Sequence, residues 1–279
     1  MVVIIRYGEL SLKGQLRRKF ENILIGNIRR VCKREGIKGK LEREWGRLYF
    51  YSNEENTVAK RLSFVFGIVS TSPAVECESN LKSIAETVEV VVEKLLKEKH
   101  FRSFAIRAKR SGEHDFTSMD VARIAGKRVK NIDRSLKVDL KNPEVELFIE
   151  VREKSYIYTK IFKGFGGLPV GTQSRVLALD PISAWFAMRR GCDVDLAGEV
   201  SAELEAWACY RKISSIDLEF EEAIKSNYPA VFCSYNIDEL VSVAEKLKER
   251  KMPVLTPFAS EEVYSREKVK EILKSITKR

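Results

Sequence analysis

Apolar and polar residues alternate with strand or helix spacing along most of the chain, and the order of the predicted elements changes twice. In the first segment, Phe20, Leu24, Ile28 and Val31 recur with helical spacing on one face of a predicted helix. The predicted elements there are a strand over 2–7, a helix over 16–34, a hairpin over 40–44 and 47–52, a helix over 56–65 and a strand over 68–74. This order is that of a ferredoxin-like fold.

The second and third segments follow a boundary that we place at Pro73 and the polar residues 76–80. The second is predicted to contain helices over 81–100 and 118–132 and strands over 104–109, 136–140, 145–151 and 156–162. In the third, predicted strands over 176–179, 193–197, 230–234 and 254–256 alternate with helices over 182–190, 202–210, 237–251 and 266–278. Such alternation predicts a small parallel α/β layer. The predicted domains are therefore 1–75, 76–165 and 166–279.

Charge distinguishes the three domains. The formal net charge is +10, and it divides into +8 for residues 1–75, +4 for 76–165 and −2 for 166–279. A polyanion, above all nucleic acid, is the natural partner of the first two domains. The alternative is a solvated surface that serves only solubility.

Basic side chains gather at three places in these two domains. The helix over 118–132 carries a stripe at spacings of 4, 3 and 4 residues, opposite its apolar face. The candidate RNA-binding residues are Arg123, Lys127, Lys130 and Arg134 on this stripe, Arg107, Lys109 and Arg110 at the preceding strand, and Lys13, Arg17, Arg18 and Lys19 where the first helix opens. They could neutralise several phosphates with little base preference. The alternative is an ordinary solvated face. Arg128 falls on the apolar side and is interpreted as structural.

Several classes of function are not supported. The five cysteines are widely spaced and form no CxxC pair, which predicts no disulfide framework and a reducing, cytoplasmic location. His100 and His114 match no metal spacing, so no metal site is expected. No apolar run approaches a membrane span, and the opening run is too short for a signal peptide. Scarce Gln and His with abundant Lys, Arg and Glu are typical of a heat-adapted source.

Several separate motifs resemble the tRNA 4-thiouridine sulfurtransferases. They are RYGELSLKG at 6–14 followed by Arg18-Lys19-Phe20, VFGI at 65–68, NPEVELFIEVREKSYIY at 142–158 and GGLPVG at 166–171. The resemblance covers essentially residues 1–192. It implies a ferredoxin-like N-terminal domain, a THUMP domain that binds tRNA, and a PP-loop ATP pyrophosphatase domain, in that order. It also implies that the first two domains hold the acceptor end of tRNA.

The third domain departs from that family. Its enzymes carry Ser-Gly-Gly-Ile-Asp-Ser between a strand and a helix, where the glycines and serines hold ATP phosphates. Here the junction runs Leu179-Asp180-Pro181 without those glycines, so Cβ groups and a proline ring crowd the phosphate space. The glycines of 164–171 precede the strand and are interpreted as an interdomain connector. The family's sulfur-carrying cysteines have no clear counterpart, and Thr256 stands where an arginine is usual.

Three functions are consistent with these residues. The favoured one is a tRNA-binding protein that has a degenerate catalytic domain and needs no cofactor, and that pairs with a second copy or a partner through 166–279. The second is an active sulfurtransferase that binds ATP with Mg²⁺ in a non-standard site. The third is an adaptor that hands tRNA to a separate modifying enzyme. Room for a triphosphate at Asp180 distinguishes the first from the second.

Overall fold

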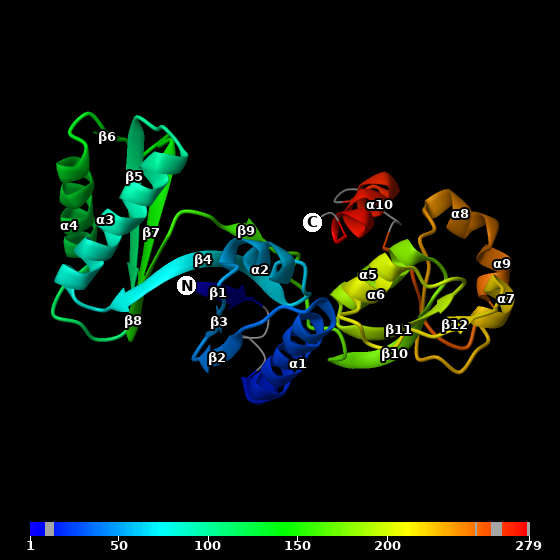
Figure 1. Cartoon of the computed structure of the whole chain (residues 1–279). Coiled ribbons are helices and arrows are strands. Elements are labelled where there is room, and N and C mark those ends of the chain that lie inside the picture. The colour runs from blue at the N-terminus through cyan, green and yellow to red at the C-terminus, as the bar shows by residue number, and fades with distance from the viewer. Residues whose placement is uncertain (9–13, 249, 258–263, 278–279) are drawn as a thin grey trace.

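Three units follow one another along the molecule in Figure 1. The structure is a computed structural model, and it describes residues 1–8, 14–248, 250–257 and 264–277. The N-terminal unit lies in the middle of the view, the second unit on its left and the C-terminal α/β unit on its right. No helix among these residues is long and apolar enough to cross a bilayer.

The N-terminal unit has the predicted order of elements. These are β1 (Val2–Tyr7), the 3-10 turn η2 (Gly14–Leu16), α1 (Arg17–Glu35), β2 (Lys40–Glu44), β3 (Arg47–Tyr51), α2 (Glu55–Leu62) and β4 (Ile68–Glu78). The strands pair in the order β2-β3-β1-β4. Val3 and Ile5 of β1 pack on Leu24 and Ile28 of α1, so the predicted apolar face of that helix covers the sheet.

The second unit shares a strand with the first. Val2 pairs with Ala74 on β4, while Val75, next along the same strand, pairs with Ile157 of β8. The unit comprises α3 (Leu81–Glu98), β5 (Ser103–Arg110), α4 (Ser118–Ile132), β6 (Lys137–Val138), β7 (Val145–Val151) and β8 (Lys154–Tyr158), and β9 (Phe162–Lys163) returns to β4. One sheet therefore runs β2-β3-β1-β4-β8-β7-β5-β6. The predicted strand end at residue 74 is wrong, because the polar residues beyond Pro73 continue the ladder.

The C-terminal unit is the predicted parallel layer, with strand order β12-β11-β10-β13-β14. Its strands are β10 (Gln173–Ala178), β11 (Cys192–Ala197), β12 (Ser215–Ile216), β13 (Val231–Phe232) and β14 (Val254–Leu255). Its helices are α5 (Pro181–Arg189), α6 (Ala202–Trp207), α7 (Phe220–Ala223), α8 (Ile237–Ser242), α9 (Ala244–Leu247) and α10 (Arg266–Ser275). The single helix predicted over 237–251 is wrong: it divides at Val243, and neither piece buries a residue that could stabilise a longer helix.

The connector of residues 164–171 joins the first and third units by direct contacts. Gly67 donates its N–H to the carbonyl of Gly166, and the buried Asn27 side chain donates to the carbonyl of Val170. Phe66 of the first unit packs edge-on against Trp185 and lies 5.2 Å from Trp207, ring centre to ring centre. The two units therefore share one aromatic core.

Candidate functional site

The helix α4, which carries the predicted stripe, lies on the outer left of the second unit in Figure 1. Thr117 caps the helix in a capping box with Asp120. Arg123 is exposed and pairs with Asp120 at 3.0 Å, and Lys127 and Arg134 are also exposed. Lys130 donates to the carbonyls of Arg134 and Leu136 at 2.5 and 2.7 Å. Part of the predicted stripe thus holds the loop after α4 against the helix.

The three candidates on β5 do not share one surface. Arg107 donates to Glu146 at 2.8 Å and to the carbonyl of Leu140. Together with Lys109 it lines a cavity of about 180 Å³ on the sheet face away from the helices. Arg110, at the strand end, is exposed and donates to the carbonyls of Gly112 and His114. Arg128 pairs with Glu89 of α3 at 3.0 Å, in keeping with its structural interpretation.

The start of α1 carries the other candidates. Arg17 donates to the buried Glu21 at 2.8 Å, and Arg18 and Lys19 are exposed. Lys13 lies outside the described residues. Glu21 also accepts a hydrogen bond of 2.6 Å from Tyr7. Burial opposes its ionisation, but these bonds and Arg17 outweigh burial and lower the pKa of Glu21.

Turns that are far apart in the sequence meet at one edge of the long sheet and form a surface that the sequence indicated only in part. The Arg17 guanidinium lies over the Trp45 ring, 4.5 Å from its centre, at the β2–β3 turn. Arg152, at the β7–β8 turn, donates to the carbonyl of Trp45 at 3.2 Å. Arg110 on β5 pairs with Val151, the neighbour of Arg152. We call this surface the basic edge; its residues are Arg17, Arg18, Arg43, Trp45, Arg110 and Arg152.

Glu150 joins the two units behind the basic edge. Its carboxylate is 8% exposed and accepts hydrogen bonds from Arg6, Arg47 and Arg152 at 3.0 to 3.1 Å. Arg6 and Arg47 belong to the first unit, whereas Glu150 and Arg152 belong to the second. Burial disfavours the charged form, but the three guanidinium groups outweigh it and lower the pKa of Glu150. Glu150 therefore fixes how the two units meet.

The strand-to-helix junction at Leu179-Asp180-Pro181 is closed by its own side chain. The Asp180 carboxylate accepts from the backbone N–H groups of Ile182 and Ser183 at 3.0 and 2.9 Å, and from that of Ser234 at 3.1 Å. Pro181 contributes no N–H, and Ala184 donates to the carbonyl of Asp180. A phosphate held at a helix start needs those same donors. Here they are already bound, and the group that binds them is itself an anion.

The five cysteines lack the features of a reactive thiol. All are free, and all except Cys77 are buried. Burial raises the pKa of Cys32, Cys192, Cys209 and Cys233 to about 11. A nucleophilic cysteine needs a lowered pKa, so these four remain neutral thiols near pH 7.

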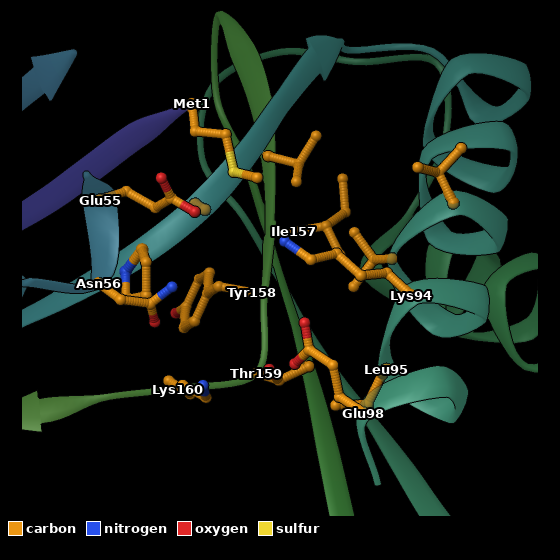
Figure 2. Close-up of a pocket in the computed structure, with 15 residues that line it drawn as sticks. Met1, Glu55, Asn56, Lys94, Leu95, Glu98, Ile157, Tyr158, Thr159 and Lys160 are labelled. Carbon is orange, nitrogen blue, oxygen red and sulfur yellow. The ribbon is translucent and has the colours of Figure 1, made fainter. Parts of the chain in front are cut away.

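A further cavity of about 250 Å³ lies between α3 and the start of α2. Figure 2 shows Met1, Ile157 and Tyr158 around it, with Lys94 and Glu98 projecting from α3. Lys160 and Glu55 add one charge of each sign. The balanced charges give this cavity no preference for an anion. No group of three or more His, Cys, Asp or Glu side chains within the described ranges could hold a metal ion.

Sequence reasoning found the basic residues of α1 and Arg110 but missed Trp45, Arg43 and Arg152. Trp45 lies at the turn of the hairpin predicted over 40–44 and 47–52, and the sequence pattern assigned it no role. The sequence did contain a signal. Trp45 lies in a two-residue turn between charged residues, and so short a turn cannot bury so large a ring. The contact of Arg152 with Trp45 spans 107 residues of sequence and has no local signature.

Comparison with known proteins gives these features a context. A model described as the ThiI ferredoxin-like domain matches residues 2–72, and the THUMP domain model matches 78–160. Proteins named tRNA sulfurtransferase are 38% identical over 77% of this chain in Methanosarcina mazei and 39% identical over 69% in Methanothermobacter thermautotrophicus. The chain covers 57% and 51% of those two proteins, so it spans little more than half of their length.

Two solved structures share the whole fold. The crystal structure of PH1313 from Pyrococcus horikoshii is 29% identical, with a TM-score of 0.80 over 99% of both chains. The structure of a 4-thiouridine synthetase in complex with RNA and ATP is 22% identical, with a TM-score of 0.76 over 99% of this chain and 84% of that one. The two matched domains and these relatives together show that the chain belongs to the THUMP-domain proteins related to the tRNA sulfurtransferases.

Proposed function

We propose that this protein binds tRNA through residues 1–165 and acts in tRNA thio-modification without activating the RNA with ATP itself. The claim that the protein does not activate RNA with ATP rests on the Asp180 carboxylate, which occupies the N–H donors at the start of α5. A triphosphate there would have to displace a bound anion and would meet its negative charge. The residues present therefore do not fit ATP phosphates or their Mg²⁺, and no cofactor is assigned.

RNA binding is supported by the THUMP match, by the positive charge of the first two domains and by the basic edge. The solved relative of the same fold was captured with RNA. Duplex RNA would contact such a surface mainly through phosphates, so affinity should fall steeply with salt. By family resemblance, the acceptor end of tRNA is the part bound. The free thiols are in keeping with the reducing cytoplasm.

The sulfur chemistry would then come from another protein, because the four buried thiols are not activated. Residues 166–279 would serve as a platform for that enzyme or for a second copy of this chain. An active ATP-dependent sulfurtransferase is the competing function, and it requires the Asp180 carboxylate to leave the helix start when ATP arrives.

The test measures RNA binding and ATP use on the same purified protein. Binding of a tRNA transcript is followed by gel shift at several salt concentrations, and adenylation is followed with radiolabelled ATP. We expect salt-sensitive RNA binding and no adenylated RNA. Adenylated RNA would overturn the loss of ATP chemistry, whereas absent RNA binding would overturn the whole proposal.

Paired charge reversals locate the RNA surface. Arg123→Glu with Lys127→Glu reverses two exposed charges on α4 and spares Lys130, which donates to the carbonyls of Arg134 and Leu136 after the helix. Lys248→Glu with Lys270→Glu makes the same change of charge on the C-terminal unit and serves as the control. We expect the first pair to weaken binding much more than the second. Equal affinities for both pairs would remove α4 from the interface.

A further inference from the structure

We infer that Trp45 is a stacking platform for an unpaired base of the bound RNA. Its side chain is 82% exposed, whereas the other two tryptophans of the chain, Trp185 and Trp207, are completely buried. A ring of this size is seldom left in water without a partner. The inference rests on the proposed RNA binding and adds the residue that would contact a base.

The surroundings of Trp45 hold the ring in place and leave one face available. Arg17 covers one face through a cation–π contact, with its guanidinium carbon 4.5 Å from the ring centre. Arg17 is itself fixed by its hydrogen bond to the buried Glu21. At 82% exposure, the opposite face of the indole meets solvent. A flat ring that is anchored on one side is preorganised for a second flat ring on the other.

The charge around Trp45 selects a nucleotide rather than an apolar partner. The adjoining cavity, about 430 Å³ in volume, is lined by Arg17, Arg18 and Arg43. Its acids are Glu44 and Glu21, which forms an ion pair with Arg17 and accepts a hydrogen bond from Tyr7. Arg152 adds a further cation at the backbone of Trp45. Cations beside an exposed aromatic face match a phosphate beside a base.

The base must be unpaired, because bases inside a duplex stack on one another and do not offer their faces. A single-stranded end or a loop supplies such a face. Stacking tolerates any base, so Trp45 should read single-strandedness rather than sequence. The phosphate contacts of the basic edge would supply the remaining, salt-sensitive affinity.

Intrinsic fluorescence tests this inference, since Trp45 is the tryptophan that a soluble quencher can reach. Two RNAs are compared: a blunt duplex and the same duplex with a single-stranded 3′ overhang. We expect the overhang RNA to lower the emission and to protect Trp45 from acrylamide, and the blunt duplex to do neither. Unchanged access of acrylamide to Trp45 in the overhang complex would overturn the inference.

Substitution gives an independent measure. Trp45→Ala should weaken binding of the overhang RNA by roughly 5- to 100-fold, the range measured for stacking on one base, and should leave the blunt duplex within about twofold. Trp45→Phe should restore much of the loss. The fold should be unaffected, because the ring is exposed and Arg152 contacts only the backbone carbonyl. If the wild type binds neither RNA, the proposed function fails; if Trp45→Ala binds both as the wild type does, the inference alone fails.

Discussion

Replacing Glu150 with Gln tests the claim that one buried carboxylate fixes the junction of the first two units. The substitution keeps the shape of the side chain and removes its charge. Three guanidinium groups, from Arg6, Arg47 and Arg152, then face one another without a counter-charge. Their side chains are only 15% to 24% exposed, so water screens them incompletely. Removing one partner of a buried ion pair costs about 3–5 kcal/mol.

That loss should be visible as a melting temperature of the Glu150→Gln variant below that of the wild type. For a unit the size of residues 1–165, each kcal/mol shifts the midpoint by about 2–4 °C, so a drop of roughly 6–12 °C is expected for 3 kcal/mol. Differential scanning calorimetry at pH 7 measures it. Glu153→Gln is the matched control, because Glu153 lies three residues further on, in the β7–β8 turn, and is exposed. Its effect should stay within about 0.5 kcal/mol.

The dependence of stability on pH provides the refutation. The folded-state pKa of Glu150 is lowered, so its contribution is present above the unfolded value of about 4.3 and is lost as pH falls through the folded pKa. The difference between wild type and Glu150→Gln should therefore shrink in acid. A variant that melts with the wild type at pH 7, or a difference that does not shrink in acid, would refute the reasoning.

Two further predictions concern the core shared by the first and third units and the buried thiols. Phe66→Ala should destabilise the protein by about 3–5 kcal/mol, because Phe66 fills the aromatic core shared by the first and third units. In calorimetry the two units should then melt separately, and a single unchanged transition would contradict this. At pH 8 a thiol reagent should react only after unfolding with the four buried thiols, those of Cys32, Cys192, Cys209 and Cys233; fast labelling of these thiols in the folded protein would contradict their assignment as inert. The free energy of unfolding should fall as pH rises from about 9 toward 11, because these thiols ionise at lower pH in the unfolded chain than in the folded protein.

The fold could be predicted from the sequence where one element buries one apolar face. The helix of Phe20, Leu24, Ile28 and Val31 is such a case, since its period alone specifies the packing. The continuity of β4 could not be predicted in this way. Beyond Pro73 the strand carries Glu76 and Glu78, and it is held by a partner strand about eighty residues later. When only neighbouring residues are considered, polar residues whose partner strand lies so far away in the sequence look like a linker.

The candidate site was predictable only in part, for the same reason. Helical spacing indicated Arg123 and Lys127, which are exposed as expected. It could not show that Lys130 bonds to two carbonyls in the loop after its own helix. Nor could it bring Trp45 next to Arg152, because that contact depends on how two units meet across Glu150.

The Asp180 cap also explains how a phosphate loop can be absent without loss of the fold. A helix start needs acceptors for its first N–H groups, and a bound phosphate supplies them in a nucleotide site. Asp180 supplies them from within the chain and also ties the start of α5 to Ser234 at the end of β13. The α/β unit thus stays folded with no ligand. Its aromatic side chains still complete the core around Phe66, so the unit contributes to the stability of the N-terminal unit whether or not it holds ATP.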